Sequence, residues 1–347
     1  MKKNLQRLIK PFVFSFYSFL IDDNLDKIHS NILIEGVVIK STGSWYTVRA
    51  KNRDIACRIK GKFRIQGIKS TNPVTVGDHV TLEMEENENT GVITEIHDRK
   101  NYIIRKSVNL SKQTHIIAAN IDVAFLLVTL VEPPTFPSFI DRFLATAEAY
   151  DIPAVLLFNK IDLYTSEELM QKKDDLLALY RKIGYKCIEI SVTTGLNIDL
   201  VQQEMMGKVS MFSGHSGVGK SSLINKIAPY LDLKTAEISY QHKQGQHTTT
   251  FAEMFILPTD PESYIIDTPG IKGFGVVDFS DEEVGDFFPE IFALKSQCKF
   301  SNCIHVNEPK CAVKKAVEAG EIAPTRYRSY LQILAGEEEH YRTDFFE

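Results

Sequence analysis

The most constraining feature of the sequence is one glycine-rich segment. It is Gly214-His215-Ser216-Gly217-Val218-Gly219-Lys220-Ser221, which fits G-x-x-x-x-G-K-[ST] without a mismatch and is followed by Ser222. An apolar strand is predicted before it (209–212) and a helix after it (220–228). Glycines let backbone N–H groups wrap a phosphate, and the helix N-terminus adds positive potential. We expect nucleotide phosphates here, with Lys220 at the β- and γ-phosphates and Ser221 on Mg²⁺. The alternative is a chance glycine-rich turn.

A second motif, Asn159-Lys160-Ile161-Asp162, follows the apolar run 154–158. N-K-x-D at a strand end is the guanine-reading motif of GTPases. The Asp162 carboxylate can accept hydrogen bonds from guanine N1–H and the exocyclic amine, which adenine cannot donate in that geometry. Lys160 would lie along the base plane, and Asn159 would tie this loop to the purine and the phosphate loop. Ser191 and Val192, after the next strand, suit a supporting base loop. Alone, N-K-x-D could also be a helix N-cap.

A third group of residues suits the γ-phosphate and the metal ion bound to it. Asp267-Thr268-Pro269-Gly270 has the form D-x-x-G after the apolar run 264–266. We expect Asp267 to hold Mg²⁺ through water and the Gly270 amide to meet the γ-phosphate. Between the two motifs lies the segment 245–251, where Thr248 or Thr249 is expected to close on Mg²⁺ in the GTP state. A polar surface loop is the alternative for this segment. The predicted Mg²⁺ ligands are Ser221, Thr249 and Asp267.

The order of these motifs is rotated relative to Ras-like GTPases, in which the phosphate loop comes first. Here the base-reading motif precedes the phosphate loop, and the threonines and D-x-x-G follow it. Circular permutation moves the chain ends while keeping the spatial site. Near-continuous apolar runs alternate with helical stretches from about residue 120, which predicts a parallel α/β domain. The sequence therefore predicts a circularly permuted P-loop GTPase domain over 106–280.

Two further regions flank this domain, and each has its own pattern. Alternating apolar residues and regularly spaced glycines over 31–105 predict a small β-barrel of about five strands, such as an OB-fold. Residues 281–347 are polar and helical, and we expect a helical zinc-binding domain there. The net charge of −5 excludes a uniformly basic nucleic-acid coat but not a local basic patch. Five cysteines in 347 residues make no disulfide framework.

Three of those cysteines cluster with a histidine at the start of the C-terminal region. Cys298, Cys303, His305 and Cys311 lie within 14 residues of one another. Four nitrogen and sulfur ligands suit tetrahedral Zn²⁺ in a closed structural site. Because no ligand position is left open, we expect a structural zinc rather than a catalytic one. The spacing is not the common C-x₂-C form, so buried thiols beside a surface histidine are the alternative.

Together these features resemble the bacterial family of ribosome small subunit-dependent GTPase A. The resemblance rests on the barrel, on "NKID", "GHSGVGKSS", "HTTT" and "DTPG" in permuted order, and on the Cys/His cluster, and it covers about residues 31–335. It implies GTP hydrolysis stimulated by the small (30S) ribosomal subunit, coupled to release, and a role in late maturation of that subunit. It also supports the zinc site. One departure is Gln246, where the family usually has a basic residue before the switch histidine.

A basic stripe within the barrel region suits RNA. Between residues 49 and 69 the only acid is Asp54. OB-folds bind nucleic acid with a basic face and stacking aromatic side chains, and Trp45, Tyr46 and Phe63 are nearby. A solvated basic face is the alternative, and the resemblance to a ribosomal family favours RNA. The predicted RNA-binding residues are Arg49, Lys51, Arg53, Arg58, Lys60, Lys62 and Arg64.

The sequence also contains candidates for the group that activates the attacking water. Many Ras-like GTPases place a glutamine directly after D-x-x-G, and here Ile271 occupies that position. His247 is the nearest candidate, because an imidazole could orient water or act as a base. Lys220 and Thr249 are the other predicted catalytic residues. A histidine that only packs or faces solvent is the alternative. Either way we expect slow intrinsic turnover that the ribosome accelerates.

The first 30 residues fit none of these regions. Basic residues precede an apolar stretch over 11–21, as in a signal peptide, but acidic Asp22 and Asp23 stand where a cleavage site would be. We expect a poorly packed extension, a cytoplasmic protein, no stable membrane association and a monomer. Two other functions stay open. One is an RNA-binding assembly factor with GTP as a static cofactor, and the other is a secreted or membrane-anchored regulator.

Overall fold

The structure is a computed structural model of the 347-residue chain. It describes residues 33–59, 73–85, 89–106, 114–231, 252–267 and 280–336. Of Asp267 it describes the backbone alone. Several predicted features lie outside the described residues: the extension 1–30, Lys60, Lys62, Arg64, His247, Thr248, Thr249 and Gly270.

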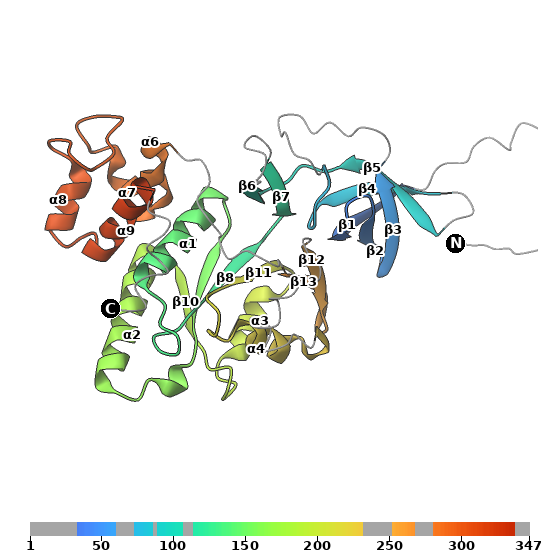
Figure 1. The fold of residues 1–347 in the computed structure, drawn as a ribbon, viewed down its shortest axis with the longest axis horizontal. Coiled ribbons are helices and arrows are strands. Elements are labelled where there is room, and N and C mark those ends of the chain that lie inside the picture. The colour runs from blue at the N-terminus through green and yellow to red at the C-terminus, as the bar shows by residue number, and fades with distance from the viewer. Residues whose placement is uncertain are drawn as a thin grey trace, which may run out of the picture. The chain divides into compact units, whose positions relative to one another are not determined.

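The N-terminal part of the described chain is the predicted barrel. Its strands are β1 (Leu33–Ser41), β2 (Tyr46–Ala50), β3 (Arg53–Ile59), β4 (His79–Met84) and β5 (Thr90–Ile96). They are hydrogen-bonded in the order β1-β2-β3-β5-β4, and β4 pairs back to β1, which closes the barrel (Figure 1). The β3–β5 pair is parallel and the others are antiparallel. Alternate side chains fill the interior, among them Val38, Val48, Ile55, Leu82 and Ile93. The predicted OB-like barrel is confirmed.

A hairpin follows the barrel and spans the predicted boundary at residue 105. It consists of β6 (Tyr102–Lys106) and β7 (Thr114–Ala119), which the sequence patterns had not separated from their surroundings. The turn before β4 packs tightly on this hairpin. Gly77 has a φ of +90°, and a Cβ there would lie 2.0 Å from the carbonyl oxygen of Ala119. Only glycine fits this position, because both the backbone conformation and the space exclude a side chain.

The central domain is built on a mostly parallel sheet. The strands are β8 (Val123–Val128), β9 (Ala154–Phe158), β10 (Lys186–Glu189), β11 (Val209–Ser213), β12 (Glu253–Leu257) and β13 (Asp260–Asp267). Their order is β10-β9-β8-β11-β13-β12, and all are parallel except β12, which pairs antiparallel with β13. At its other edge, β12 meets β1 of the barrel through the pair Lys40 and Glu253. The apolar runs of the sequence had predicted a parallel sheet in this domain but not β12.

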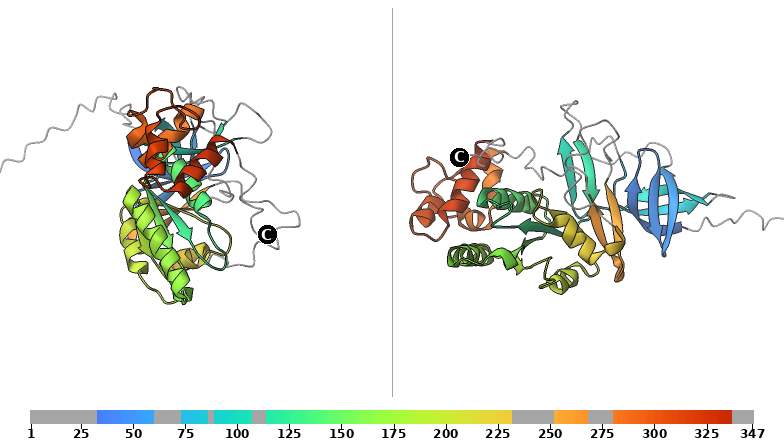
Figure 2. Two further views of the ribbon diagram at one scale, coloured as in Figure 1. Left: turned by 90° about the vertical axis from the view of Figure 1, so that its left-hand side faces the viewer. Right: turned by 60° about the horizontal axis from the view of Figure 1, so that its bottom comes forward.

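Helices cover both faces of this sheet (Figures 1 and 2). They are α1 (Pro137–Ala149), α2 (Glu167–Ile183), α3 (Ile198–Met205) and α4 (Lys220–Ile227), with short 3₁₀ turns η2 (Ile161–Leu163) and η3 (Pro229–Leu231). Successive residues of β8 face opposite cores. Leu126 packs with α1 and α2, while Phe125 and Leu127 pack with α3 and α4. This alternation explains why the strands are continuously apolar, since both of their faces are buried.

The C-terminal part is helical, as predicted. It comprises α6 (Asp281–Val284), η4 (Gly285–Phe287), α7 (Pro289–Lys295), α8 (Ala312–Glu318) and α9 (Pro324–Leu334). A buried ion network joins it to the central domain. Arg326 on α9 donates to Asp141 on α1 at 2.9 Å and to Glu290 on α7 at 2.6 Å, and Tyr180 on α2 also donates to Asp141.

No helix in the described part of the chain is long and apolar enough to cross a bilayer.

Candidate guanine-nucleotide site and metal centre

The fold brings the predicted nucleotide-binding motifs to one edge of the central sheet. The base-reading motif follows β9, Ser191 and Val192 follow β10, and the phosphate loop follows β11. These strands are parallel, so their carboxyl ends meet at the same edge, where ligands bind in open α/β sheets. Asp267 is the last residue of β13, which is parallel to β11. The rotated order of the motifs therefore leaves their spatial arrangement intact.

Asn159 connects the base-reading loop to the phosphate loop. Its side-chain amide donates to the carbonyl oxygen of Val218 at 2.8 Å, and its Oδ1 accepts from the backbone N–H of Val192 at 3.2 Å. Asn159 is 1 % exposed, so both contacts are shielded from water. A Cβ on Gly219 would lie 2.5 Å from the Asn159 side-chain nitrogen, and Gly219 has a φ of +97°. Glycine at this position is thus required both by the turn and by the amide of Asn159.

Asp162 is held in a defined orientation at the exposed side of the same loop. The hydroxyl of Ser191 donates to Asp162 Oδ1 at 2.6 Å, and the backbone N–H of Thr194 donates to Ser191 Oγ at 3.1 Å. This arrangement fixes one carboxylate oxygen, while the Asp162 side chain as a whole remains exposed. It can therefore accept hydrogen bonds from a base edge.

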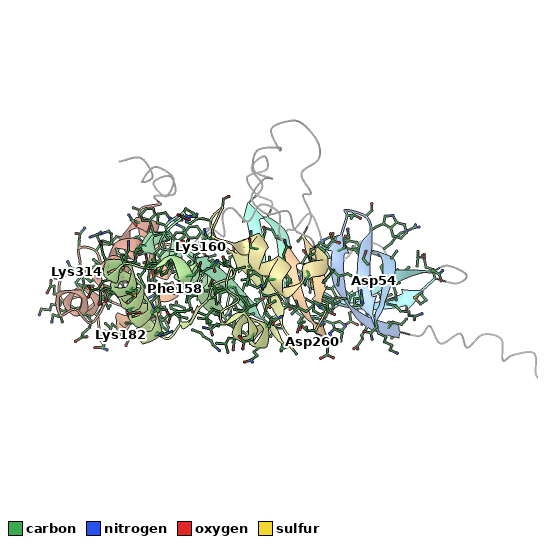
Figure 3. All side chains as sticks on the ribbon, turned by 90° about the horizontal axis from the view of Figure 1, so that it is seen from below. Asp54, Phe158, Lys160, Lys182, Asp260 and Lys314 are labelled. Carbon is green, nitrogen blue, oxygen red and sulfur yellow. The ribbon has the colours of Figure 1, made fainter. Side chains whose placement is uncertain are left out.

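Lys160 adopts a backbone conformation that residues with a Cβ rarely take. Its φ is +62°, and its ammonium group donates to the carbonyl oxygen of Glu132. Figure 3 labels Lys160 just beyond Phe158, the last residue of β9. A left-handed residue other than glycine costs about 1 kcal/mol, and such conformations cluster at functional sites. Lys160 as a whole residue is half-buried.

The phosphate loop has the backbone that its glycines predict. Gly214, Gly217 and Gly219 all have positive φ angles, and α4 begins at Lys220. Val218 is buried in the core beneath the loop, whereas Ser216 and Gly217 are exposed. Lys220, Ser221 and Ser222 occupy the first turn of α4, where backbone N–H groups have no partner within the helix. This is an anion-binding geometry.

The His215 side chain of the phosphate loop packs against α1. Its ring lies 3.7 Å from the ring of Phe139 in the first turn of α1, centroid to centroid. Burial lowers the pKa of His215, so its imidazole is neutral at pH 7. A neutral ring adds no charge to the phosphate site, which leaves Lys220 as the predicted cationic group of the loop.

The four metal-ligand candidates converge in the segment between α7 and α8. The ligand atoms of Cys298, Cys303, His305 and Cys311 all lie within 4.8 Å of one another. His305 Nδ1 is 3.5 Å from Cys298 Sγ and 3.4 Å from Cys311 Sγ, and the two sulfurs are 3.8 Å apart. With Zn–S bonds of about 2.3 Å, a tetrahedron has S–S edges of about 3.8 Å. The donor set therefore fits a tetrahedral zinc ion.

The protonation of these donors depends on what binds them. Burial raises the pKa of the Cys303 thiol to about 12 and also raises that of Cys311, so both are thiols at neutral pH without a cation. Burial lowers the pKa of His305, which favours the neutral imidazole that metals bind. A bound cation would displace the thiol protons. The other two cysteines, Cys57 and Cys187, are buried in the barrel and the central sheet.

The predicted RNA-binding residues that the structure describes lie on β2 and β3 and in the turn between them. Lys51, Arg53 and Arg58 are exposed, and the Arg58 guanidinium lies 4.3 Å from the centroid of the Trp45 ring. Arg49 is half-buried and donates to Asp54 at 2.5 Å. Tyr46 is not available for stacking on a base, contrary to the sequence analysis, because its ring is buried inside the barrel.

The sequence patterns missed one aromatic residue of the site. Tyr164 lies two residues after the base-reading motif and is buried against it, with hydrogen bonds to Asn159 and Leu130. A lone tyrosine after the motif carries no recognisable pattern. The proline-rich stretch 132–137 also contacts the site, since Glu132 accepts from Lys160.

The fold and the site define a circularly permuted P-loop GTPase with an N-terminal OB-like barrel and a C-terminal Cys₃His cluster. The family model RsgA GTPase matches residues 96–277, and the model of the RsgA N-terminal domain matches residues 35–93. The chain belongs to the RsgA GTPase family, and it is a GTP-hydrolysing enzyme.

Relatives and solved structures agree with this assignment. The small ribosomal subunit biogenesis GTPase RsgA of Christiangramia forsetii is 64% identical over 317 residues, which cover 90% of this chain and all of the relative. The protein of the same name from Flavobacterium johnsoniae is 61% identical and is covered to 96%. YjeQ from Thermotoga maritima has a TM-score of 0.71 and 34% identity, over 88% of this chain and 98% of that one. YloQ, titled a circularly permuted GTPase, has a TM-score of 0.67 and 30% identity, over 90% and 98%.

Proposed function

We propose that this enzyme acts in the biogenesis of the small ribosomal subunit, which it binds in its GTP form and leaves after hydrolysis. The observation that carries the proposal is the joint presence of a guanine-nucleotide edge and a barrel with exposed cations in one chain. The names of the relatives from Christiangramia and Flavobacterium support the ribosomal assignment. The subunit's stimulation of turnover, its late stage of maturation and the coupling to release are parts of the same proposal.

Each predicted nucleotide contact has a place in this proposal. Asp162 accepts from the guanine, Lys160 lies along the base, and Asn159, Ser191 and Val192 hold the loop. Residues 214–222 wrap the phosphates, with Lys220 at the β- and γ-phosphates and Ser221 as a ligand of Mg²⁺. The position of Ser221 in the first turn of α4 and the end of β13 at Asp267 support this metal assignment. Thr248, Thr249 and Gly270 complete the γ-phosphate contacts.

Hydrolysis needs a group that orients water, and the chain's candidate is His247. Ile271 has no hydrogen-bonding side chain, so it cannot take the role that glutamine has in many GTPases. We propose that His247, Lys220 and Thr249 serve catalysis and that the subunit completes the site. A His247→Ala variant that kept its full stimulated turnover would remove His247 from the mechanism.

We also propose roles for the two flanking parts. The described cations Arg49, Lys51, Arg53 and Arg58 contact ribosomal RNA together with Lys60, Lys62 and Arg64, and the exposed Trp45–Arg58 pair supports such a surface. The Cys₃His cluster holds one structural Zn²⁺, which the sulfur and nitrogen separations support. The four-part organisation at residues 30, 105 and 280, a monomeric state and a cytoplasmic location without stable membrane association belong to the same proposal.

The test is GTP turnover by the full chain, measured with and without purified small subunits. We expect slow intrinsic release of phosphate and a large acceleration by small subunits, with large subunits as the control. A Lys220→Ala variant provides the background rate. Equal turnover with and without small subunits would contradict the proposal. In that case a bound GTP that persists would indicate a static cofactor in an RNA-binding assembly factor.

A further inference from the structure

Buried hydrogen bonds hold the base-reading loop in place, and some of them come from residues outside the nucleotide-binding motifs. Besides the two side-chain bonds of Asn159, the backbone N–H of Asn159 donates to the carbonyl oxygen of Val128 at 2.8 Å. Its own carbonyl oxygen accepts from the hydroxyl of Tyr164 at 2.8 Å. Every polar group of Asn159 therefore has a protein partner, and Tyr164 supplies a side-chain partner from outside the motifs.

Tyr164 joins two segments at this point. Its hydroxyl accepts from the backbone N–H of Leu130 at 2.9 Å while it donates to Asn159. The side chain is 5 % exposed, and burial raises its pKa to about 12, so the hydroxyl stays protonated and can donate at neutral pH. A single oxygen thus satisfies two backbone groups that water does not reach.

The second segment, residues 129–135, lies between the Tyr164 side chain and the phosphate loop. Thr129 donates through its hydroxyl to the carbonyl oxygen of Pro133 at 2.6 Å, and the backbone N–H of Thr129 donates to the Thr135 hydroxyl at 3.1 Å. A Cβ on Gly217 would lie 3.2 Å from Pro133 Cδ, so the proline ring lies directly against the phosphate loop. Glu132, between them, accepts from the ammonium group of Lys160.

We propose that Tyr164 is a positioning residue for guanine recognition. It holds the base-reading loop against segment 129–135, and through that segment against the phosphate loop, so that Asp162 meets the base in one orientation. Tyr164 does not touch the nucleotide in this proposal, which rests on the proposed guanine site. Removing its hydroxyl leaves the Leu130 N–H and one acceptor of Asn159 without their partner. The base-reading loop then becomes more mobile, and the hydrogen bonds between Asp162 and the base are partly lost.

The test uses two diphosphates that differ in one contact. Inosine diphosphate lacks the 2-amino group that Asp162 accepts from guanine, so the ratio of its dissociation constant to that of GDP measures this contact. We expect the wild-type chain to favour GDP by about tenfold or more, as for a hydrogen bond to a charged group. In a Tyr164→Phe variant this preference should fall by about threefold to tenfold. Calorimetric titration measures both constants.

The matched control is Tyr185→Phe. The Tyr185 hydroxyl is also buried in the central domain and donates to Glu148 at 3.0 Å, but Glu148 lies on α1 away from the base-reading loop. This variant removes the same group and should leave the ratio unchanged. If Tyr164→Phe weakens both diphosphates by the same factor, or changes the ratio no more than Tyr185→Phe does, the positioning role is wrong.

Two further measurements separate the possible failures. If the wild-type chain binds ADP as tightly as GDP, the guanine site itself is wrong, whatever the tyrosine does. If Tyr164→Phe does not fold, Thr129→Val tests the other end of the support, since it removes the hydroxyl bond to Pro133 while keeping the shape. We expect a smaller fall of the same ratio in Thr129→Val, and an unchanged ratio would overturn the proposal.

Discussion

The two binding regions of this chain are stabilised in different ways. Around Asn159 and Asp162, protein groups hold the base-reading loop. Val218 and Val192 bond the Asn159 side chain, Tyr164 bonds its backbone carbonyl oxygen, and Ser191 bonds one carboxylate oxygen of Asp162. Around His305 the four ligand atoms face one another, and three of them are sulfurs. The backbone N–H of Lys314 donates to one of these sulfurs, Cys311 Sγ, at 3.5 Å. From this difference we expect that the protein itself organises the nucleotide edge, whereas the Cys₃His cluster depends on a bound cation.

The loop that carries the cluster does have some support of its own. Glu308 accepts from the backbone N–H groups of Ile304 and Val306 at 2.8 and 2.9 Å. Tyr327 and Tyr330 on α9 donate to the carbonyl oxygens of His305 and Ile304 at 2.6 and 2.5 Å. These contacts shape the loop, but none of them satisfies the thiols. We expect substitutions in the two regions to differ in their effects, most of all at the metal ligands.

The largest effect is expected from loss of a metal ligand. A Cys303→Ser variant should lose its bound zinc, and the helices α7 to α9 should lose their cooperative unfolding. Structural zinc in small fingers is worth about 10–16 kcal/mol, which exceeds what a small helical region can supply alone. Metal content and hydrogen exchange in residues 289–334 measure the change. GDP affinity should remain within about twofold of the wild type.

The control for this prediction is Cys57→Ser. Cys57 is equally buried, but it lies in the barrel, far along the chain from the cluster. This variant should keep its zinc and the protection of the C-terminal helices. If Cys303→Ser also retained both, the cluster would not depend on a cation and the contrast between the two regions would fail.

An intermediate effect is expected at the buried ion network between α1 and α9. Arg326→Met leaves Asp141 buried without its charge partner, which typically costs about 3–5 kcal/mol of unfolding free energy. A double variant, Arg326→Met with Asp141→Leu, should recover part of this loss because the fully buried Asp141 charge is removed, while Glu290, whose side chain is 15% exposed, still lacks Arg326. Urea denaturation measures both. If the single variant were as stable as the wild type, the network would not join the two domains energetically.

The same variant should change how stability depends on pH. Burial raises the pKa of the Asp141 carboxyl, and the Arg326 charge works against that rise. A carboxyl whose pKa is higher in the folded state binds more protons there, so stability falls as the pH rises from the unfolded pKa through the folded one. Without Arg326 the rise is larger. We expect Arg326→Met to be less stable at pH 7 than at pH 5, and the double variant to lose that difference.

The smallest effect is expected at the support of Asp162. Ser191→Ala removes the hydroxyl that donates to Asp162 Oδ1 and accepts from Thr194. Loss of one hydrogen bond to a charged group should weaken GDP binding by about tenfold, while the unfolding free energy changes by about 1 kcal/mol. Thr193→Ala, at an exposed neighbouring position, is the control. Unchanged GDP affinity in Ser191→Ala would mean that Asp162 needs no such support.

Much of the fold was predictable because it depends on local patterns. The alternation in the barrel and the continuous apolar runs at β8, β9 and β11 follow from which faces are buried. Once the strands were predicted to be parallel, the motifs at their ends had to meet at one edge. The cysteines and the histidine were recognisable because their spacing along the chain brings them together without long-range information.

Other features were out of reach because they depend on contacts between distant segments. Arg326 and Asp141 are 185 residues apart in the chain, and neither stands in a motif. Tyr164 acts through hydrogen bonds to backbone groups, which any residue possesses, so its partners leave no trace in the sequence. The strand β12 is antiparallel to β13 and no helix separates the two, so the predicted helix–strand alternation did not include it. The orientation of Tyr46 into the barrel depends on the register of β2.

The central claim is that Asp162 reads the base in a site assembled from motifs in permuted order. The most direct measurement compares GDP and xanthosine diphosphate binding to the wild-type chain and to an Asp162→Asn variant. Xanthine carries an oxygen where guanine has its 2-amino group, so it needs a donor rather than an acceptor at this position. We predict that the wild type binds GDP and that the variant prefers xanthosine diphosphate. A variant that still preferred GDP would contradict the account.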